Sequence, residues 1–131
     1  MKKFFSILAI VLITNLLFTA CSSSSKTAAP VKAVEDYLKT LVAKDDNRLP
    51  TLVCGSWEED AMIALDSFQA VTPKLENVAC AQSGIDGSTV LVKCTGNIVM
   101  TYNNEDQRLD LSTLTYQVVQ QNGDWLVCGT R

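Results

Sequence analysis

The stretch TVLVKCTGNIVMTY, residues 89–102, alternates between apolar and polar side chains over most of its length. Alternate side chains of a strand point to the same face of a sheet, so this period predicts a long strand with one buried face. That face is expected to carry Val90, Val92, Cys94, Ile98, Met100 and Tyr102. The stretch is therefore expected to be the long strand of an antiparallel sheet.

The alternation continues on both sides of this strand. Residues 74–81 are expected to form the preceding strand. Downstream, the apolar positions change parity between Leu111 and Leu114, which predicts a β-bulge near residues 112–113. Asn122-Gly123 is typical of a two-residue hairpin turn and predicts one more strand after it. The sequence thus predicts a four-stranded antiparallel sheet.

The sequence before this sheet has helical periodicity. Apolar residues recur at helical spacing after Pro30, a residue well suited to the first turn of a helix. A short second helix is expected around Leu49 and Val53, and Ser56-Trp57-Glu58-Glu59 predicts a capping box that opens a third. Three N-terminal helices followed by a four-stranded sheet predict an α+β fold in which the helices cover one sheet face.

The N-terminus has the pattern of an export signal. Lys2 and Lys3 precede an apolar run that ends at Phe18, and small residues follow immediately before Cys21. The sequence LFTAC, residues 17–21, resembles the bacterial lipobox, in which the cysteine is acylated and becomes the first mature residue. We expect residues 1–20 to be a lipoprotein signal peptide, residues 21–29 a lipidated cysteine with a flexible tether, and residues 30–131 one domain. Acylated Cys21 would then anchor the chain to the lipid bilayer of the cell envelope, on the extracytoplasmic side.

Charge and composition narrow the classes of partner. Loss of residues 1–20 removes Lys2 and Lys3 from the 11 basic residues and leaves all 14 acidic ones, so the mature net charge is near −5. This balance argues against a nucleic acid partner. The chain has no histidine and no closely spaced pair of cysteines. These features predict no metal, no cofactor and no nucleophilic cysteine site.

One of the five cysteines is expected to have a different role from the other four. With Cys21 assigned to lipid, Cys54, Cys80, Cys94 and Cys128 remain, and an even number in an oxidising compartment predicts two disulfides. Three pairings are possible. Cys80 and Cys94 flank a hairpin turn, IDGS at residues 85–88, so they are expected to lie opposite each other and pair. Cys54 and Cys128 would then pair by elimination.

The order of these elements resembles a known superfamily. The opening helix AVEDYLKTLVAKD (33–45), the segment TYQVVQQNGDW (115–125) and the terminal GDWLV (123–127) resemble nuclear-transport-factor-2-like proteins over residues 31–131. Within that superfamily, the chain is most similar to small lipoprotein domains of unknown function from bacterial envelopes. The resemblance implies a cone, formed by helices and a curved sheet, that can hold a small molecule. Residue type suggests that its lining includes Tyr37, Trp57, Phe68, Tyr116 and Trp125. Of these, Tyr37, Trp57, Tyr116 and Trp125 are expected to be core or cone lining rather than a reactive set.

The functional expectation follows from the anchor and the cone. The leading hypothesis is a non-catalytic, membrane-anchored domain that binds a small apolar molecule or an envelope protein. The resemblance also implies that the chain could form a homodimer through an exposed sheet face that carries Thr95, Asn97, Val99 and Thr101. One alternative is an enzyme of the ketosteroid-isomerase-like or SnoaL-like type that uses Tyr37 or Tyr116 and a carboxylate, but Asp60 and Asp110 are both expected to face solvent, and no catalytic residue is assigned. Another alternative is a structural accessory subunit of an envelope complex.

Overall fold

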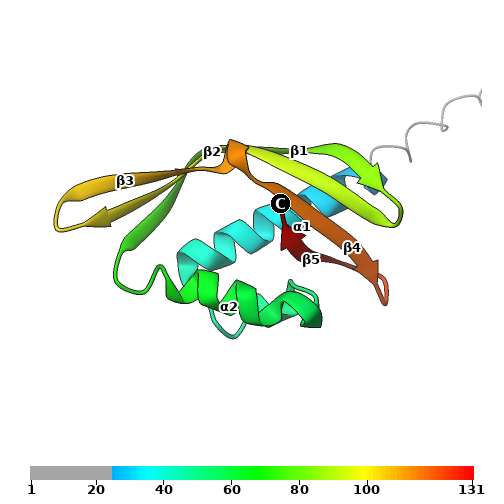
Figure 1. Cartoon of the computed structure of the whole chain (residues 1–131), viewed down its shortest axis with the longest axis horizontal. Coiled ribbons are helices and arrows are strands. Elements are labelled where there is room, and N and C mark those ends of the chain that lie inside the picture. The colour runs from blue at the N-terminus through cyan, green and yellow to red at the C-terminus, as the bar shows by residue number, and fades with distance from the viewer. Residues whose placement is uncertain (1–24) are drawn as a thin grey trace, which may run out of the picture.

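The computed structural model describes residues 25–131, so the predicted signal peptide and Cys21 lie outside the described residues. Within that range the chain forms two α-helices, three short 3-10 turns and five strands. The helices are α1 (Ser25–Ala43) and α2 (Glu58–Asp66), and both lie on one side of the sheet (Figure 1). None of the helices in residues 25–131 is long and apolar enough to cross a membrane. The α+β class is confirmed, whereas the predicted three helices and four strands are wrong in number.

The strands form one antiparallel sheet around the long central strand. They are β1 (Thr72–Asp86), β2 (Thr89–Tyr102), β3 (Glu105–Asp110), β4 (Thr115–Gln121) and β5 (Asp124–Thr130). β1 pairs with β2 along one edge, while the other edge of β2 pairs first with β4 and then with β3. β5 extends the sheet beyond β4. Figure 1 shows the end of β2 and β3 projecting as an arm away from the helices.

The additional strand arises where a bulge was predicted. Residues 111–113 form a 3-10 turn, so β3 and β4 are separate strands that pair with different halves of β2. The carboxylate of Asp110 accepts a hydrogen bond from the backbone N–H of Ser112 at 2.8 Å and stabilises the turn. A turn changes the face to which the following residues point, which accounts for the parity change between Leu111 and Leu114.

The predicted second helix is shorter than expected. Only residues 49–51 form a 3-10 turn. The backbone that follows pairs with β5 instead: the N–H of Cys54 donates to the carbonyl of Val127 at 2.9 Å, and the N–H of Val127 donates to the carbonyl of Leu52 at 3.0 Å. Because these backbone groups bond to a strand, they cannot continue a helix.

The predicted capping box is not formed. Residues 55–57 make a 3-10 turn, α2 begins at Glu58, and no side chain caps its first residue. Ser56 therefore lies one residue too early to act as the N-cap. At the N-terminal side, α1 begins at Ser25 and Pro30 lies inside it, so the helix starts earlier than predicted.

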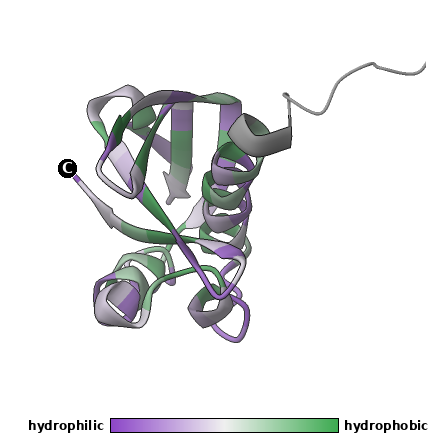
Figure 2. Cartoon of the chain, turned by 90° about the vertical axis from the view of Figure 1, so that its right-hand side faces the viewer, coloured by the Kyte–Doolittle hydropathy of each residue, from purple (hydrophilic) through white to green (hydrophobic). Residues whose placement is uncertain are grey.

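The core lies between the helices and the sheet. Val34 and Leu38 of α1, Leu65 of α2, and Val92 and Val118 of the sheet are buried there. In Figure 2 the colour along the strands changes between hydrophobic and hydrophilic, as expected for strands that bury one face.

Two disulfides fasten this core. Cys80 and Cys94 are directly paired residues of β1 and β2, with their Cα atoms 4.0 Å apart. The second disulfide joins Cys54, before α2, to Cys128 of β5, with Cα atoms 4.9 Å apart. These are the two pairs expected from the sequence.

Candidate functional site

A pocket of about 450 Å³ lies between the two helices and the sheet. This volume is within the usual range for sites that bind small molecules. Its walls come from α1, the 3-10 turn before α2, α2 and the residues just after it, β2, β3, the turn after β3, β4 and the end of β5. The lining residues are Tyr37, Leu38, Leu41, Trp57, Asp60, Ala64, Ser67, Phe68, Ile98, Leu109, Leu111, Leu114, Tyr116 and Thr130.

Three aromatic rings meet at one side of the pocket. The ring centroid of Tyr37 is 5.5 Å from that of Trp57, with the planes inclined at 44°. It is 6.2 Å from that of Tyr116, in an edge-to-face arrangement at 63°. Such contacts stabilise the aromatic pairs beyond the area they bury. Tyr37 thus connects α1 to the start of α2 and to β4.

Both tyrosine side chains are part of the core and also line the pocket. Tyr37 and Tyr116 are only 3% and 2% exposed. Among residues 28–131 no hydrogen bond joins either hydroxyl to a neighbour, and no fully buried side-chain nitrogen or oxygen lacks a partner. The two hydroxyl oxygens therefore keep a small exposed surface and are free to bond to a ligand or water.

The buried position of these phenols keeps them protonated. Burial raises the pKa of Tyr116 to about 12. Burial, and to a lesser extent the proximity of Tyr116, raises the pKa of Tyr37 well above its usual value. At neutral pH both groups are neutral and can donate hydrogen bonds, but neither is poised to act as a base.

Asp60 is the pocket residue that the sequence analysis placed in solvent. It is exposed, yet it also lines the pocket. In the sequence, Trp57, Asp60, Ala64 and Phe68 follow one another at intervals of three or four residues, the spacing of one helix face, and in the structure Asp60 and Ala64 lie within α2, with Trp57 just before it and Phe68 just after it. This spacing was available in the sequence, but the negative charge of Asp60 favoured a solvent-facing interpretation.

Four of the five aromatic residues expected from the sequence line the pocket: Tyr37, Trp57, Phe68 and Tyr116. Trp125 does not line the pocket and is partly buried against the core instead. Asp110 is exposed and holds the turn after β3. Leu109, Leu111 and Leu114 of the pocket wall were not anticipated, because their position depends on that turn. Among residues 28–131 no group of three His, Cys, Asp or Glu side chains is placed to hold a metal ion.

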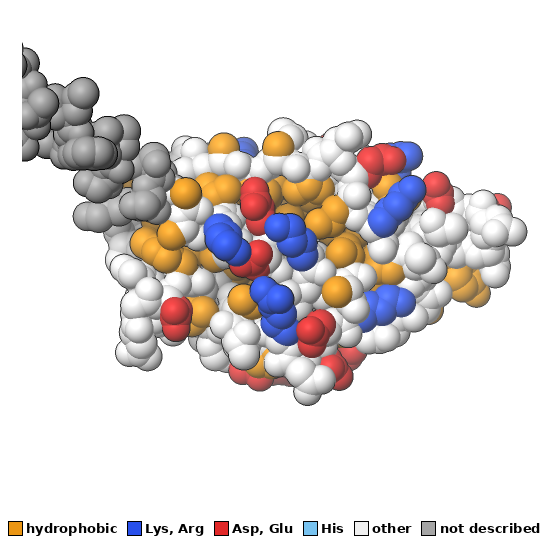
Figure 3. Space-filling model, turned by 180° about the vertical axis from the view of Figure 1, so that it is seen from behind, with side chains coloured by type: hydrophobic (Ala, Val, Ile, Leu, Met, Phe, Trp, Pro, Cys, Tyr) orange, Lys and Arg blue, Asp and Glu red, His pale blue; other side chains and the backbone are white. Residues whose placement is uncertain are grey.

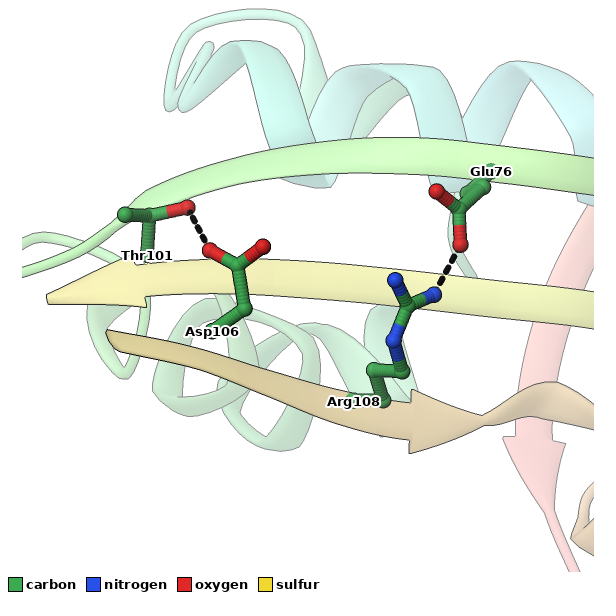
Figure 4. A network of polar contacts seen from close by, with 4 residues as sticks. All are labelled: Glu76, Thr101, Asp106 and Arg108. Atoms are coloured by element: carbon green, nitrogen blue, oxygen red, sulfur yellow. Dashed lines mark hydrogen bonds and ion pairs between the residues drawn. The ribbon is translucent and has the colours of Figure 1, made fainter. Parts of the chain in front are cut away.

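The opposite face of the sheet differs from expectation at Val99. Its side chain is completely buried, so it does not add to an apolar surface patch there. Arg108 of β3 forms an ion pair with Glu76 of β1, across β2 and beside Val99 (Figure 4). Thr101 donates a hydrogen bond to Asp106 at 2.6 Å on the same face. The face is therefore polar along the arm.

Charges elsewhere on the surface are mixed. Seen from behind, the molecule carries Lys and Arg side chains interspersed with Asp and Glu (Figure 3). On this side no large area of a single sign stands out.

Comparison with known proteins gives a fold but no family. No family model matches the chain, and no curated protein matches it. Among solved structures, a SEC-C motif-containing protein from Rhodopseudomonas palustris, RPA3114, is 12% identical with a TM-score of 0.57, over 79% of this chain and 78% of that one. This likeness concerns the fold alone.

A second match is a designed NTF2-like protein, a variant of Rd1NTF2_05. It is 13% identical over 76% of this chain and 92% of that chain, with a TM-score of 0.47. That score is too low to establish a shared fold.

Proposed function

We propose that this chain is a lipid-anchored protein of the bacterial cell envelope whose nuclear-transport-factor-2-like domain binds a small, mostly apolar molecule without transforming it. The observation that carries the proposal is the pocket of about 450 Å³, which is walled by aliphatic and aromatic side chains together with the polar side chains of Asp60, Ser67 and Thr130. Apolar walls combined with a small number of polar side chains are typical of a site that binds and orients a ligand. The lipobox-like sequence before Cys21 supports the anchor.

The bound molecule can be sought directly. Extraction of the purified full-length chain with organic solvent, followed by mass spectrometry, is expected to release one predominant small molecule. A second lipoprotein purified in the same detergent serves as the control for carried-over lipid. The same background of lipids from both proteins would contradict the proposal and would favour a structural accessory role.

The anchor has an independent test. The intact mass of the mature chain is expected to show loss of residues 1–20 and the addition of acyl chains at Cys21. Cys21→Ser is expected to abolish both the added mass and membrane retention. An unmodified wild-type Cys21 in the mature chain would contradict the anchored form while leaving the pocket proposal intact.

A cone-site enzyme is the second candidate. It is supported by the presence of Tyr37, Tyr116 and Asp60 on one pocket, since a phenol and a carboxylate are the groups that acid–base chemistry requires. The raised pKa of both tyrosines and the exposure of Asp60 support binding more than proton transfer. Conversion of the extracted molecule by the wild-type chain, but not by Asp60→Asn, would favour the enzyme.

A further inference from the structure

We infer that the pocket selects an organic cation: a ligand with a substituted ammonium head and an apolar body. This inference rests on the proposed function, because it names the chemical class of the molecule that the same pocket binds.

Among the residues that line the pocket, the charge is negative only. Asp60 is the charged residue among those that line the pocket, and no Lys or Arg is found in that lining. A carboxylate attracts a cation and repels an anion, and the surroundings of a partly enclosed cavity strengthen both effects relative to bulk water. An anionic ligand would find no positive partner among the lining residues.

The aromatic rings line the same pocket as this carboxylate. Trp57 ends the 3-10 turn that leads into α2, and Asp60 lies three residues later, in the first turn of the helix. Tyr37 contacts Trp57 from α1, with ring planes inclined at 44°. Inclined aromatic rings next to a carboxylate are the arrangement that recognises quaternary ammonium groups, because a cation is attracted to the ring faces.

The helix supports a fixed negative charge at this position. Asp60 is in the first turn of α2, where the N–H groups at the helix N-terminus favour a carboxylate. It is exposed, so a bound ammonium group would keep part of its hydration at the mouth of the pocket.

The remaining volume fits an apolar body. A small ammonium head fills only part of about 450 Å³. The lining also includes aliphatic side chains from α1, β2, β3 and the turn after it, namely Leu38, Leu41, Ile98, Leu109, Leu111 and Leu114. An amphiphilic cation therefore satisfies both parts of the pocket.

The test compares three probes of similar size and different charge: benzyltrimethylammonium, benzyl alcohol and phenylacetate. Their affinities are measured by isothermal titration calorimetry with the full chain in neutral maltoside micelles. The cation is expected to bind about 10-fold more tightly than the alcohol, and phenylacetate more weakly than either.

Two charge variants locate the effect. Asp60→Asn is expected to weaken the cation about 5-fold and to leave benzyl alcohol unchanged. Glu59→Gln removes the neighbouring charge, which does not line the pocket, and is expected to change either affinity less than about 2-fold. Trp57→Leu is expected to lower the preference for the cation over the alcohol.

Each contrary outcome has a distinct meaning. Equal binding of the three probes, or tighter binding of phenylacetate, overturns the cation inference and leaves the proposed binding function standing. Equal losses in Asp60→Asn and Glu59→Gln also overturn it, since they would reflect only overall charge. Binding of none of the probes counts against the proposed function and the inference together.

Discussion

At the scale of single residues, the sharpest constraint on this fold is Gly96 in the middle of β2. Its φ is +93°, and a Cβ placed there would lie 2.5 Å from the backbone carbonyl oxygen of Asn77. Asn77 itself has a positive φ and lies where the pairing of β1 with β2 shifts. A left-handed residue opposite a bulge bends both strands, and the arm begins just beyond this bend.

Gly96→Ala is expected to lower the free energy of unfolding by about 3 kcal/mol, because backbone strain and a backbone clash add together. The matched control is Gly87→Ala in the β1–β2 turn, where φ is +61° but nothing lies within 4 Å of the added Cβ. It is expected to cost only about 1 kcal/mol. Urea denaturation measures both, and equal losses would show that the contact with Asn77 is unimportant.

The two pocket tyrosines predict a loss of stability at high pH. The unfolded chain releases these protons near pH 10, whereas the folded chain retains them to about pH 12 at Tyr116 and beyond pH 10 at Tyr37. Above pH 10 the unfolded state therefore binds fewer protons. The free energy of unfolding falls by up to about 1.4 kcal/mol per pH unit for each tyrosine.

Urea denaturation between pH 9 and pH 12 checks this slope. The double variant Tyr37→Phe with Tyr116→Phe is expected to flatten it, while the exposed Tyr102→Phe is expected to retain it. An unchanged slope in the double variant would place the pH dependence elsewhere.

At the scale of elements, Lys44 at the end of α1 links this helix to the segment that follows α2. Lys44 has a φ of 56° just after the helix, and its N–H donates to the carbonyl of Leu41 at 3.1 Å. Its Nζ donates to the carbonyl of Val71 at 2.7 Å, in the segment between α2 and β1. This one side chain therefore fixes where the chain enters the sheet.

Lys44→Met keeps most of the side-chain length and removes the hydrogen bond to Val71. We expect it to destabilise the fold by about 1–2 kcal/mol, the usual cost of losing a charged hydrogen bond that is partly buried. Lys39→Met, at an exposed position of α1, is the control and is expected to change stability by less than about 0.5 kcal/mol. Thermal unfolding distinguishes the two, and similar melting temperatures would contradict the role of Lys44.

The disulfides also act between elements, and their loop lengths predict unequal effects. Cys54–Cys128 closes a separation of 74 residues, and Cys80–Cys94 one of 14. In the chain-entropy model, the longer loop contributes about 4.5 kcal/mol and the shorter one about 3 kcal/mol. Denaturation of the two double alanine variants is expected to show the larger loss for Cys54→Ala with Cys128→Ala. A larger loss from the pair at 80 and 94 would contradict the entropic account.

Sequence patterns predicted strands and turns best where one face of the strand is buried. Alternation identified β2, and Asn122-Gly123 correctly predicted the turn between β4 and β5. Every residue of β3 is exposed, so its pattern carried no sign of a separate strand. The short helix expected around Leu49 was wrong because the following backbone bonds to β5, a partner more than 70 residues away in sequence.

At the scale of the whole molecule, local sequence patterns predicted the pocket only in part, as they did the individual elements. The aromatic residues Tyr37, Trp57, Phe68 and Tyr116 were chosen by type, and the structure brings these four together. Asp60 was missed because its negative charge favoured a solvent-facing interpretation, although its spacing from Trp57 and Ala64 was visible in the sequence. The leucines in and after β3 were missed because their position depends on the turn at residues 111–113, a tertiary feature with no local pattern.

Native mass spectrometry of the detergent-solubilised full chain is the most direct test of whether the pocket holds a small molecule. Ala64 lines the pocket on α2, while its neighbour Ile63 is 61% exposed and points elsewhere. We predict a bound small mass on the wild-type chain and on Ile63→Trp, and its absence from Ala64→Trp, whose added ring would project into the pocket and obstruct it. A wild-type chain without any bound mass, or a mass retained equally by both variants, would contradict the claim.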